Sequence, residues 1–448
     1  MNQADAFSAL KEQFSGTIIL PTDDEYDTAR VTYAVTDAKP ALIARAANQE
    51  DVAAAIHFAA THSLQLSIRS GKHSAAGFST NTGGLVLDLS QLNSIEVLDE
   101  KTGLVRLGTG ALWGDVANKL GEHGLAISSG DTKSVGVGGL TLGGGIGWMV
   151  RKYGYAIDSL VAAEVVLANG SVVHASEEEY SDLFWGLRGG GGNFGVVISF
   201  DFKAHAQGKV VSHTVTYAPD TLSKIVAGWR DYMRSADEDI TSFMTLLPSF
   251  GPNPPVIMIA SCYAKDDEAK AATLFEPLER LGSPTSKTMS LMPYAEMLQE
   301  AHPPQGVQFT AKDMYVKVLQ DDLIAQLNEI CCKPGSPIVQ LRMMNGAADR
   351  IDTLATAMAH RGNEAFLFAG FPAPIGAGKE LIAKSLKTWS ELAVYGNGGY
   401  ANFISTNTEG DVTAIYPPAT YERLATIKQQ YDPENIFKHN FNIKPRQQ

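Results

Sequence analysis

The sequence predicts an α+β protein with more than one domain, and three observations support this prediction. The chain has 448 residues, which is enough for two domains or for one large domain with an insertion. Up to about residue 205, short apolar strands and helices are joined by glycine-rich loops. Beyond that point strands and helices alternate without such loops, which is typical of an antiparallel sheet flanked by helices. We therefore predict a first domain over residues 1–205, a second over 206–395, and a C-terminal segment over 396–448.

Hydrophobic periodicity and turn residues predict the individual elements. A helix over residues 48–62 is expected to begin at Asn48, and a helix over 113–123 to end at Gly124. Asn169 and Gly170 predict a hairpin turn. Further helices are expected over residues 222–233, 267–281, 351–361 and 418–431. Strands are expected over residues 40–45, 64–68, 85–89, 104–107, 159–167, 172–174, 195–202, 212–217, 243–247, 256–263 and 338–344.

Composition narrows the class of protein. Hydrophobic residues make up 44% of the chain and charged residues 19%, as in ordinary globular proteins. The net charge of −13 and the lack of a long basic stripe argue against a nucleic-acid partner. No apolar run reaches the roughly 18 residues that a membrane span needs, and the N-terminus does not look like a secretory signal. Three cysteines without metal-ligand or disulfide spacing favour a cytoplasmic, reduced location.

Residues 130–147, GDTKSVGVGGLTLGGGIG, are the most unusual segment and are called the glycine stretch below. Its eight glycines disfavour a regular helix or strand, because glycine loses the most conformational freedom on folding. Apolar residues such as Val137 and Leu140 lie between the glycines, unlike the polar residues of a flexible linker. The stretch is therefore predicted to be a buried, ordered loop. Its N–H groups need a partner, and a phosphate-bearing cofactor is the natural one.

Familiar nucleotide and catalytic motifs fit this chain poorly. Residues 136–141 look like a Rossmann fingerprint, but that motif needs a helix directly after it, and more glycines follow here. No Walker loop is present. No other potential metal ligands occur at a suitable spacing from His73, so the sequence does not predict a metal site there. A Ser–His–Asp triad is also not predicted, because the chain has no nucleophile elbow. A lone histidine is more often structural than catalytic. The surrounding loop, residues 69–74, is nevertheless rich in groups that bind anions.

Five segments in a fixed order carry a resemblance that covers nearly the whole chain. They are residues 69–78 (RSGKHSAAGF), the glycine stretch, residues 152–158 (KYGYAID), residues 183–197 (LFWGLRGGGGNFGVV) and the ending over residues 431–443 (YDPENIFKHNFNI). With these segments the chain resembles the berberine-bridge-enzyme-like branch of the vanillyl-alcohol-oxidase superfamily, and most of all its shorter bacterial members.

The resemblance implies a fold and a cofactor. It implies a PCMH-type FAD-binding domain of two α/β subdomains, with a core of about 36–205, and completed by residues 396–448. The substrate domain would carry an antiparallel sheet flanked by helices. The residues expected to bind FAD are Arg69, Ser70, Gly71, Lys72, His73, Ser74, Gly130, Asp131, Ser134, Val135, Gly136, Gly138, Gly139, Gly143, Gly147, Val197, Asn402, Asn440 and Asn442.

By the resemblance, three of these residues and the neighbouring Thr132 also imply how the flavin is held. His73 would carry the 8α-methyl group of the flavin on a ring nitrogen. Thr132 stands where bicovalent members have a cysteine, so the resemblance implies one covalent bond and not two. Val135 aligns with the position that gates oxygen, and its small side chain favours an oxidase. Lys72 departs from the family, which usually has a small residue there, often glycine.

The catalytic residues are expected near the C-terminal segment and on one strand. A tyrosine commonly serves as base in the family; Tyr400 is the first candidate and Tyr153 and Tyr315 are weaker ones, although each could equally be a core aromatic. On the predicted strand 338–344, Gln340 and Arg342 share one face with Met344. In related chains this face points towards substrate; the alternative is a solvated sheet face.

The expected function is oxidation of a C–H bond next to oxygen or nitrogen in a small organic substrate. Hydride would pass to covalent FAD and the electrons to molecular oxygen, with release of hydrogen peroxide. Three alternatives remain open at this point. They are a dehydrogenase with another electron acceptor, a nicotinamide-dependent reductase of the cell-wall precursor type, and a non-catalytic binding or storage protein with the same fold.

Overall fold

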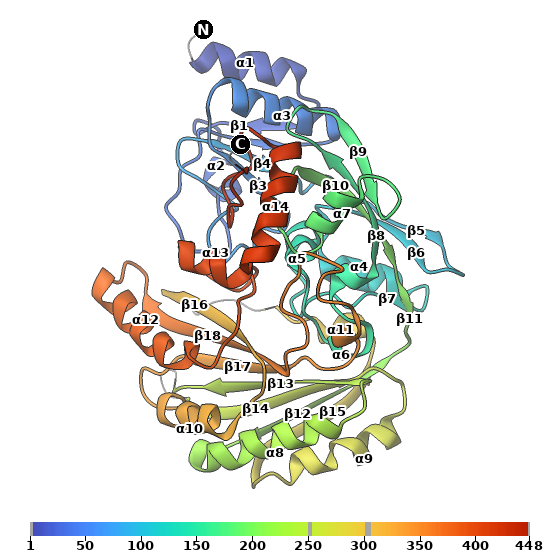
Figure 1. The fold of residues 1–448 in the computed structure, drawn as a ribbon, viewed down its shortest axis with the longest axis vertical. Coiled ribbons are helices and arrows are strands. Elements are labelled where there is room, and N and C mark those ends of the chain that lie inside the picture. Colours follow the sequence, from blue (N-terminus) through green and yellow to red (C-terminus); the bar gives the residue numbers. More distant parts are fainter. Residues whose placement is uncertain (1–2, 250–252, 301–305, 447–448) are drawn as a thin grey trace.

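The computed structural model describes residues 3–249, 253–300 and 306–446, and it contains three main sheets (Figure 1). The two smaller sheets belong to the first 205 residues, and the largest sheet forms the lower half of the view in Figure 1. This mixed architecture confirms the predicted α+β class. Among the described residues, no helix is both long enough and apolar enough to cross a bilayer.

The first sheet is four-stranded, in the order β1-β2-β4-β3. Strands β2, β4 and β3 are parallel, and β1 pairs with β2 in the antiparallel sense. Helix α3 begins after Asn48, whose side chain accepts a hydrogen bond from the Asp51 amide, as the sequence predicts. The elements of this part are α1 (Gln3–Gln13), β1 (Thr17–Ile19), α2 (Tyr26–Ala29), β2 (Leu42–Arg45), α3 (Gln49–Thr61), β3 (Leu66–Arg69) and β4 (Leu85–Asp88).

The second sheet is five-stranded and wholly antiparallel, in the order β5-β6-β10-β8-β9. The predicted hairpin turn at Asn169 and Gly170 joins β8 to β9, and Gly170 has a φ of +83°. The elements are β5 (Ile95–Asp99), β6 (Leu104–Gly108), α4 (Trp113–Gly121), β7 (Leu125–Ala126), α5 (Val137–Gly143), α6 (Val150–Tyr153), η1 (Ala156–Ser159), β8 (Leu160–Val166), β9 (Val172–Ser176), α7 (Ser181–Leu187), β10 (Val196–Lys203) and β11 (His205–Ala206).

The third sheet is seven-stranded and antiparallel, in the order β15-β12-β14-β13-β17-β18-β16. Helices cover its lower face, and the opposite face looks towards the first domain (Figure 1). Its strands are β12 (Val210–Tyr217), β13 (Ile240–Leu247), β14 (Val256–Tyr263), β15 (Pro284–Met292), β16 (Val307–Val316), β17 (Ile338–Met343) and β18 (Ala365–Pro374). Its helices are η2 (Pro219–Thr221), α8 (Leu222–Ser235), α9 (Glu268–Glu279), η3 (Tyr294–Met297), α10 (Asp321–Ile330), α11 (Ala347–Arg350) and α12 (Lys379–Ala393).

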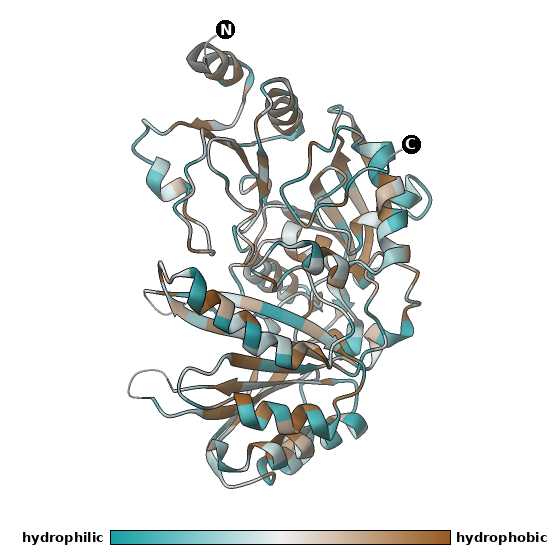
Figure 2. Ribbon diagram, turned by 60° about the vertical axis from the view of Figure 1, so that its left-hand side comes forward, coloured by the Kyte–Doolittle hydropathy of each residue, from teal (hydrophilic) through white to brown (hydrophobic). Residues whose placement is uncertain are grey.

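The two faces of the third sheet differ in what they contact. Val339, Leu341 and Met343 of β17 belong to the buried core between the sheet and its helices, which also contains Trp229 and Phe275. The brown strand segments above the helices in Figure 2 follow this apolar layer. The alternate residues of β17 therefore face the first domain, because successive side chains of a strand point to opposite sides.

The chain after the third sheet returns to the first domain. Helices α13 (Glu409–Ile415) and α14 (Pro418–Tyr431) lie beside the elements of the first 205 residues (Figure 1). Leu424, Tyr431 and Ile443 belong to the same buried cluster as Phe200 of β10. The domain boundaries themselves stay a prediction.

Three sequence expectations are wrong, each because tertiary contacts override local preference. Residues 137–143 of the glycine stretch are helical; the amides of Val137 and Gly138 bond to Ala111 and Thr109, which anchors the first turn. A Cβ at Gly138 would lie 2.4 Å from Thr109 Oγ1, so the glycine permits this close contact. The expectation that no helix follows residue 136 is therefore corrected, although the antiparallel second sheet still excludes a Rossmann fold.

The other two errors concern residues 351–361 and the start of the second glycine-rich loop, which the sequence predicts over residues 183–193 (LFWGLRGGGGN). Residues 351–361 are irregular and not helical, because their amides bond outside the segment: Ala357 to Trp185 and Met358 to Arg188. Residues 181–187, expected in part as loop, form helix α7, whose apolar side chains are buried in the core of the first domain.

Candidate functional site

The loop that follows β3 meets the glycine stretch at very short range. A Cβ at Gly71 would lie 2.2 Å from the amide nitrogen of Gly136, and one at Gly136 would lie 2.0 Å from Ser70 Oγ. Ser70 also donates a hydrogen bond of 2.6 Å to the carbonyl of Thr109. The structure thus brings together two segments that are about 60 residues apart in sequence, and only glycine allows this approach.

His73 lies half-buried at this junction. Its Nε2 is 3.0 Å from Ser134 Oγ, and its ring stacks on Tyr33 with 4.9 Å between ring centroids. Both Ser134 and His73 line a cavity of about 360 Å³. The other residues that line it are Ser70, Gly71, Lys72, Ser90, Asn93, Ile95, Gly110, Ala111, Leu112 and Asp115. The lining residues between positions 90 and 115 belong to no sequence motif, so only the structure shows that they lie at this cavity.

Arg69 does not face this junction. Its guanidinium donates to Asp88 Oδ2 at 2.6 Å and to the Ala29 carbonyl at 2.8 Å, and the side chains of Arg69 and Asp88 are both buried. The structure therefore gives this side chain a role in holding β3 to β4. In the loop over residues 69–74, a ligand would therefore meet backbone groups and not the charge of Arg69.

Lys72 stands where the resemblance implies a small residue, often glycine, and its backbone conformation is one that favours glycine. Its φ of +65° lies in the left-handed region, where a side chain other than glycine is strained. Burial, and secondarily the nearby Arg69 charge, lowers the pKa of Lys72. The conformation favours glycine, and the lysine places a cation at the cavity instead.

Replacing Lys72 with glycine is expected to stabilise the protein by about 1 kcal/mol, because it removes the strain of a left-handed residue. The same change should weaken retention of an anionic ligand, because a cation is lost from the cavity. Thermal unfolding monitored by circular dichroism checks the first expectation. Lys101→Gly, at an exposed turn without a positive φ, is the matched control. A fall in Tm for Lys72→Gly larger than that of the control would contradict the argument.

The polar atoms around the glycine stretch and the tail fit a bound FAD. Buried polar groups are normally hydrogen-bonded, yet several oxygens here have no partner among the described residues. They are Ser128 Oγ, Ser129 Oγ, Thr141 Oγ1, Asn440 Oδ1 and Asn442 Oδ1. FAD, which carries hydroxyls and a ring N–H group, would offer hydrogen-bond donors that fit these acceptor oxygens. Gly139 and Gly192, whose Cβ positions would have no atom within 4 Å, leave backbone accessible beside them.

The tail supplies the predicted asparagines. Asn402 Nδ2 donates to the Leu140 carbonyl at 3.1 Å and to the Tyr400 hydroxyl at 2.9 Å. Asn440 Nδ2 donates to the Gly192 carbonyl at 3.2 Å, which attaches the tail to the second glycine-rich loop. A Cβ at Gly143 would lie 2.3 Å from Asn402 Oδ1, so this glycine is needed for the contact.

Tyr400 points its hydroxyl at the glycine stretch. The oxygen accepts hydrogen bonds from the Gly145 amide at 2.8 Å and from Asn402 Nδ2 at 2.9 Å. Burial raises the pKa of Tyr400 to about 12, whereas both hydrogen bonds and the Arg342 charge act to lower it. Burial therefore outweighs the two hydrogen bonds and the Arg342 charge. Both hydrogen bonds come from N–H donors, so they favour the phenolate, which is the form in which a tyrosine accepts a proton.

The two weaker tyrosine candidates have different surroundings. Tyr315 is fully buried, lies 3.5 Å from the Tyr155 hydroxyl, and burial raises its pKa well above the usual value. Tyr153 bonds to the Ala206 carbonyl and to Gln207, and its ring stacks on His205 at 4.0 Å. Tyr315 shares the buried cluster of Tyr400, whereas Tyr153 lies outside that cluster.

Gln340 and Arg342 share the face of β17 that looks towards the first domain, and Met344 directly follows the strand. Arg342 donates to Asp131 Oδ2 of the glycine stretch at 2.5 Å, and its Nε donates to Gln340 Oε1 at 2.8 Å. The Arg342 guanidinium also lies over the rings of Phe243 and Phe403, at 4.3 and 4.9 Å. Its side chain is only 3% exposed. The alternative of a solvated sheet face is therefore wrong.

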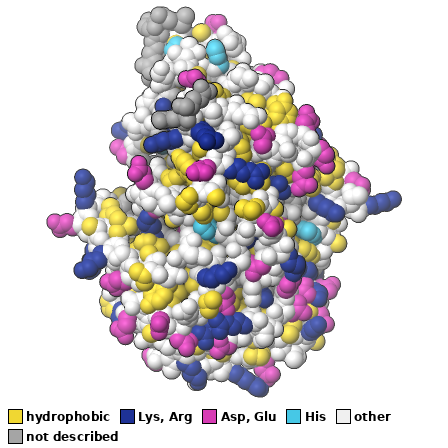
Figure 3. All heavy atoms as spheres, in the orientation of Figure 1, with side chains coloured by type: hydrophobic (Ala, Val, Ile, Leu, Met, Phe, Trp, Pro, Cys, Tyr) yellow, Lys and Arg dark blue, Asp and Glu magenta, His cyan; other side chains and the backbone are white. Residues whose placement is uncertain are grey.

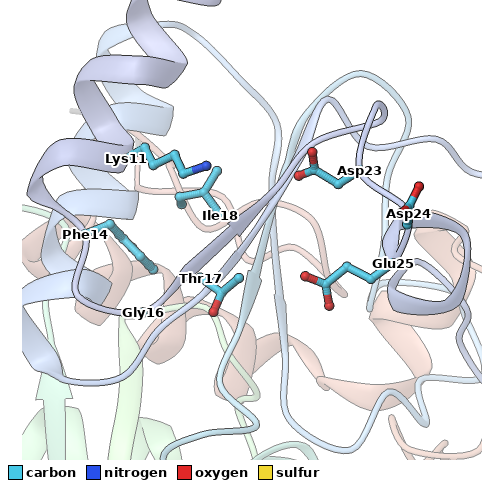
Figure 4. Close-up of a pocket in the computed structure, with 8 residues that line it drawn as sticks. All are labelled: Lys11, Phe14, Gly16, Thr17, Ile18, Asp23, Asp24 and Glu25. Carbon is cyan, nitrogen blue, oxygen red and sulfur yellow. The ribbon is translucent and has the colours of Figure 1, made fainter.

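A second cavity, of about 650 Å³, shares no lining residue with the cavity beside His73 (Figure 4). It is lined by Lys11, Phe14, Gly16, Thr17, Ile18, Asp23, Asp24 and Glu25, beside β1. Strand β1 is at one edge of the first sheet and β3, which leads to His73, is at the other.

Over the face of the molecule in Figure 3, acidic and basic side chains are interspersed without a continuous stripe of one sign. Among the described residues, no group of three potential metal ligands occurs.

Known proteins share both the flavin segments and the complete fold. The FAD binding domain family matches residues 40–176, and the Berberine and berberine like family matches residues 399–444. (R)-6-hydroxynicotine oxidase of Paenarthrobacter nicotinovorans is 29% identical, over 96% of this chain and 97% of the relative. Chitooligosaccharide oxidase of Gibberella zeae is 27% identical, over 91% of this chain and 88% of the relative.

A solved structure extends the likeness to three dimensions. The crystal structure of 6-hydroxy-D-nicotine oxidase from Arthrobacter nicotinovorans matches with a TM-score of 0.86 and 28% identity, and the match covers 97% of this chain and 98% of that chain. The two family matches include the His73 loop, the glycine stretch and the asparagines of the tail. The chain therefore contains an FAD binding domain and a Berberine and berberine like segment, it is similar to FAD-linked oxidases over nearly its whole length, and it is an FAD-dependent oxidoreductase.

Proposed function

We propose that this enzyme oxidises a C–H bond next to oxygen or nitrogen of a small organic substrate and that dioxygen takes up the electrons. The observation that carries the proposal is a convergence on the glycine stretch. His73 contacts Ser134, Arg342 pairs with Asp131, and Tyr400 bonds to Gly145. A cofactor attachment residue, a cation and a phenol from three separate parts of the chain thus meet one cofactor-binding segment.

Bound FAD supplies the hydride acceptor, and the residues of the chain supply orientation and proton transfer. Tyr400 is proposed as the base, which takes a proton from the substrate O–H or N–H when the adjacent C–H bond breaks. The N–H groups of Gly145 and Asn402 stabilise a negative charge on its oxygen. Gln340 and Arg342 are proposed to orient the substrate. Because Asp131 neutralises Arg342, this site favours neutral polar substrates over anions.

The relatives define the range of substrates to be tested. They are oxidases of 6-hydroxynicotine and of chitooligosaccharides. We therefore propose a secondary alcohol, sugar or amine as substrate of this chain. Screening such compounds, together with phenols, for hydrogen peroxide release and for bleaching of the flavin tests the proposal. Flavin bleaching by a substrate without peroxide release under air would favour a dehydrogenase, and bleaching by NADPH would favour a reductase.

We propose that FAD is bound through a single covalent bond to His73. Thr132 supports this, because it stands where bicovalent relatives have cysteine, and the chain's three cysteines lie elsewhere. His73→Ala is expected to abolish covalent flavin completely. Flavin fluorescence of the denatured band after electrophoresis measures this. His123→Ala, a change in a turn outside the cavity, is the control and should keep the bond. Retention of covalent flavin by His73→Ala would overturn the assignment.

We propose that Val135 leaves oxygen access to the flavin. Val135→Leu is expected to slow reoxidation of the reduced enzyme by air about 10-fold or more, because the larger side chain fills the approach. Stopped-flow absorbance at the flavin maximum measures the rate. The reduction rate by substrate should stay close to that of the parent enzyme, which separates an effect on oxygen from a general loss of activity. Unchanged reoxidation would contradict the gating role.

A further inference from the structure

The C-terminal segment that carries Tyr400 runs along the outer edge of the third sheet. Strand β16 is at one edge of that sheet and pairs with β18 on its inner side. The Tyr315 amide donates to the Gly398 carbonyl at 2.9 Å, and the Ser405 amide donates to the Ala311 carbonyl at 3.0 Å. The tail is therefore bonded to the backbone of β16 on both sides of Tyr400.

Between these two contacts the tail bulges away from the strand. The contact points are four positions apart on β16, at residues 311 and 315, but seven positions apart on the tail, at residues 398 and 405. The extra residues of the tail cannot pair one-to-one with the strand. They include Tyr400 and Asn402, which bond to the glycine stretch. A group other than the strand backbone must therefore hold Tyr400 in place.

The side chain of Asp313, on β16, supplies that group. Its Oδ1 accepts a hydrogen bond of 2.7 Å from the Tyr400 amide, midway between the two backbone contacts of the strand. Asp313 is only 5% exposed, and among the described residues its Oδ2 has no hydrogen-bond partner. Burying an acid is costly, and within the described part of the chain the hydrogen bond of this acid goes to the backbone of the proposed base.

The surroundings of Asp313 favour its neutral form. Burial raises the pKa of Asp313 well above its usual value and outweighs the Tyr400 amide and the Lys312 charge, which both lower it. Lys312 is itself paired with Asp411, whose charge raises the pKa of Asp313 further. Burial raises the pKa of Tyr400 most, and a negative charge on Asp313 would add to that rise. A neutral Asp313 therefore holds the Tyr400 backbone without opposing the phenolate.

We infer that Asp313 is a positioning residue for Tyr400: its carboxyl group fixes the Tyr400 backbone on β16, so that the Tyr400 hydroxyl meets the Gly145 amide. This inference rests on the role of Tyr400 as the base, which is proposed above. The backbone bonds of β16 set the two ends of the bulge, and the Asp313 bond sets the position of Tyr400 within it.

Amide hydrogen exchange of the purified flavoprotein tests the contact without a substrate. In Asp313→Leu the Tyr400 amide loses its acceptor and should exchange about 10-fold faster, whereas Asp313→Asn keeps an acceptor oxygen and should exchange as the parent does. Mass spectrometry of peptides from residues 396–405, fragmented to single residues, measures the rate. Asp349→Leu, which removes a carboxylate acceptor from the Gly362 amide, is the matched control. Unchanged exchange of Tyr400 in Asp313→Leu overturns the inference.

Flavin reduction tests whether the contact matters for the reaction. The probe is the compound that bleaches the flavin fastest in the screen described above. At saturating concentration Asp313→Leu should slow reduction by about 10- to 100-fold, the cost of misplacing a catalytic group by about 1 Å. Asp313→Asn should restore a rate close to that of the parent enzyme, because it still accepts the Tyr400 amide. If Asp313→Leu does not fold, the Asn variant decides: reduction as slow as in Tyr400→Phe overturns the inference.

A double variant separates failure of this inference from failure of the proposed function. If Asp313 acts through Tyr400, Asp313→Leu should slow reduction no further in a Tyr400→Phe background, and additive losses overturn the inference. A parent-like Tyr400→Phe enzyme means that Tyr400 is not the base, so the proposed function fails at that point. A slow Tyr400→Phe enzyme together with a parent-like Asp313→Leu enzyme means that the positioning role alone fails.

Discussion

Replacing Tyr400 with phenylalanine is expected to lower kcat by about 10²- to 10⁴-fold, the range that a general base contributes. The change removes the oxygen that accepts hydrogen bonds from Gly145 and Asn402 at the glycine stretch. Flavin should still bind covalently, because His73 is untouched. Rapid-reaction measurement of flavin reduction under anaerobic conditions isolates the step concerned. Tyr421→Phe, which removes a hydroxyl that accepts a hydrogen bond from the Lys444 amide, is the matched control.

The pH dependence gives an independent test of the same role. Burial raises the pKa of Tyr400 to about 12, so the deprotonated fraction rises about tenfold with each pH unit below that value. The reduction rate of the parent enzyme should therefore increase with pH up to the limit of its stability. The Tyr400→Phe profile should be flat. If Tyr315→Phe were slow and Tyr400→Phe were not, the base would be Tyr315.

Replacing Lys428 with methionine is expected to destabilise the fold by about 3–5 kcal/mol, the usual cost of removing one partner of a buried ion pair. The side chains of Lys428 and Asp432 are both 0% exposed. Lys428 Nζ donates to Asp432 Oδ2 at 2.6 Å and to the carbonyls of Asn193 and Phe437 at 2.7 and 2.9 Å. All three of its protons are used, and the variant leaves a buried carboxylate and two carbonyls without their donor.

Removal of the Lys428 ammonium group should also weaken cofactor binding, in addition to lowering the free energy of unfolding. Lys428 joins the second glycine-rich loop to the segment that carries Asn440 and Asn442. Denaturant unfolding measures the free energy, and the retained flavin measures the effect on the site. Lys438→Met makes the same substitution at an exposed position ten residues away and should change the free energy of unfolding by less than about 0.5 kcal/mol. A small effect at both positions would contradict the importance of the buried pair.

Segments with unusual composition could be interpreted from the sequence. The glycine stretch, the loop around His73 and the asparagines of the tail are marked by residue type, because close backbone approach requires glycine and cofactor contacts require particular polar groups. The period-2 pattern of strand 338–344 also predicted that Gln340 and Arg342 share one face, which the structure confirms through their mutual hydrogen bond. Local chemistry alone determines these features.

Other features depend on contacts between distant segments. The helix over residues 137–143 forms although three of its seven residues are glycine, because the carbonyls of Ala111 and Thr109 accept hydrogen bonds from its first amides. Residues 351–361 are irregular, because the first domain accepts their amides. Propensity cannot predict either result, since the partner groups lie far away in sequence.

The sequence by itself predicted the likeness to FAD-linked oxidases and the FAD cofactor, which the comparisons support, and it named the candidate residues for binding that cofactor. The tertiary structure decided how those residues are used. It turned Arg69 towards Asp88, paired Arg342 with Asp131, buried Tyr400 so that its pKa rises, and brought Glu300 to Ser134 beside His73. The physical reason is that charge and proton affinity depend on burial and on neighbours across the fold, which residue type alone does not specify.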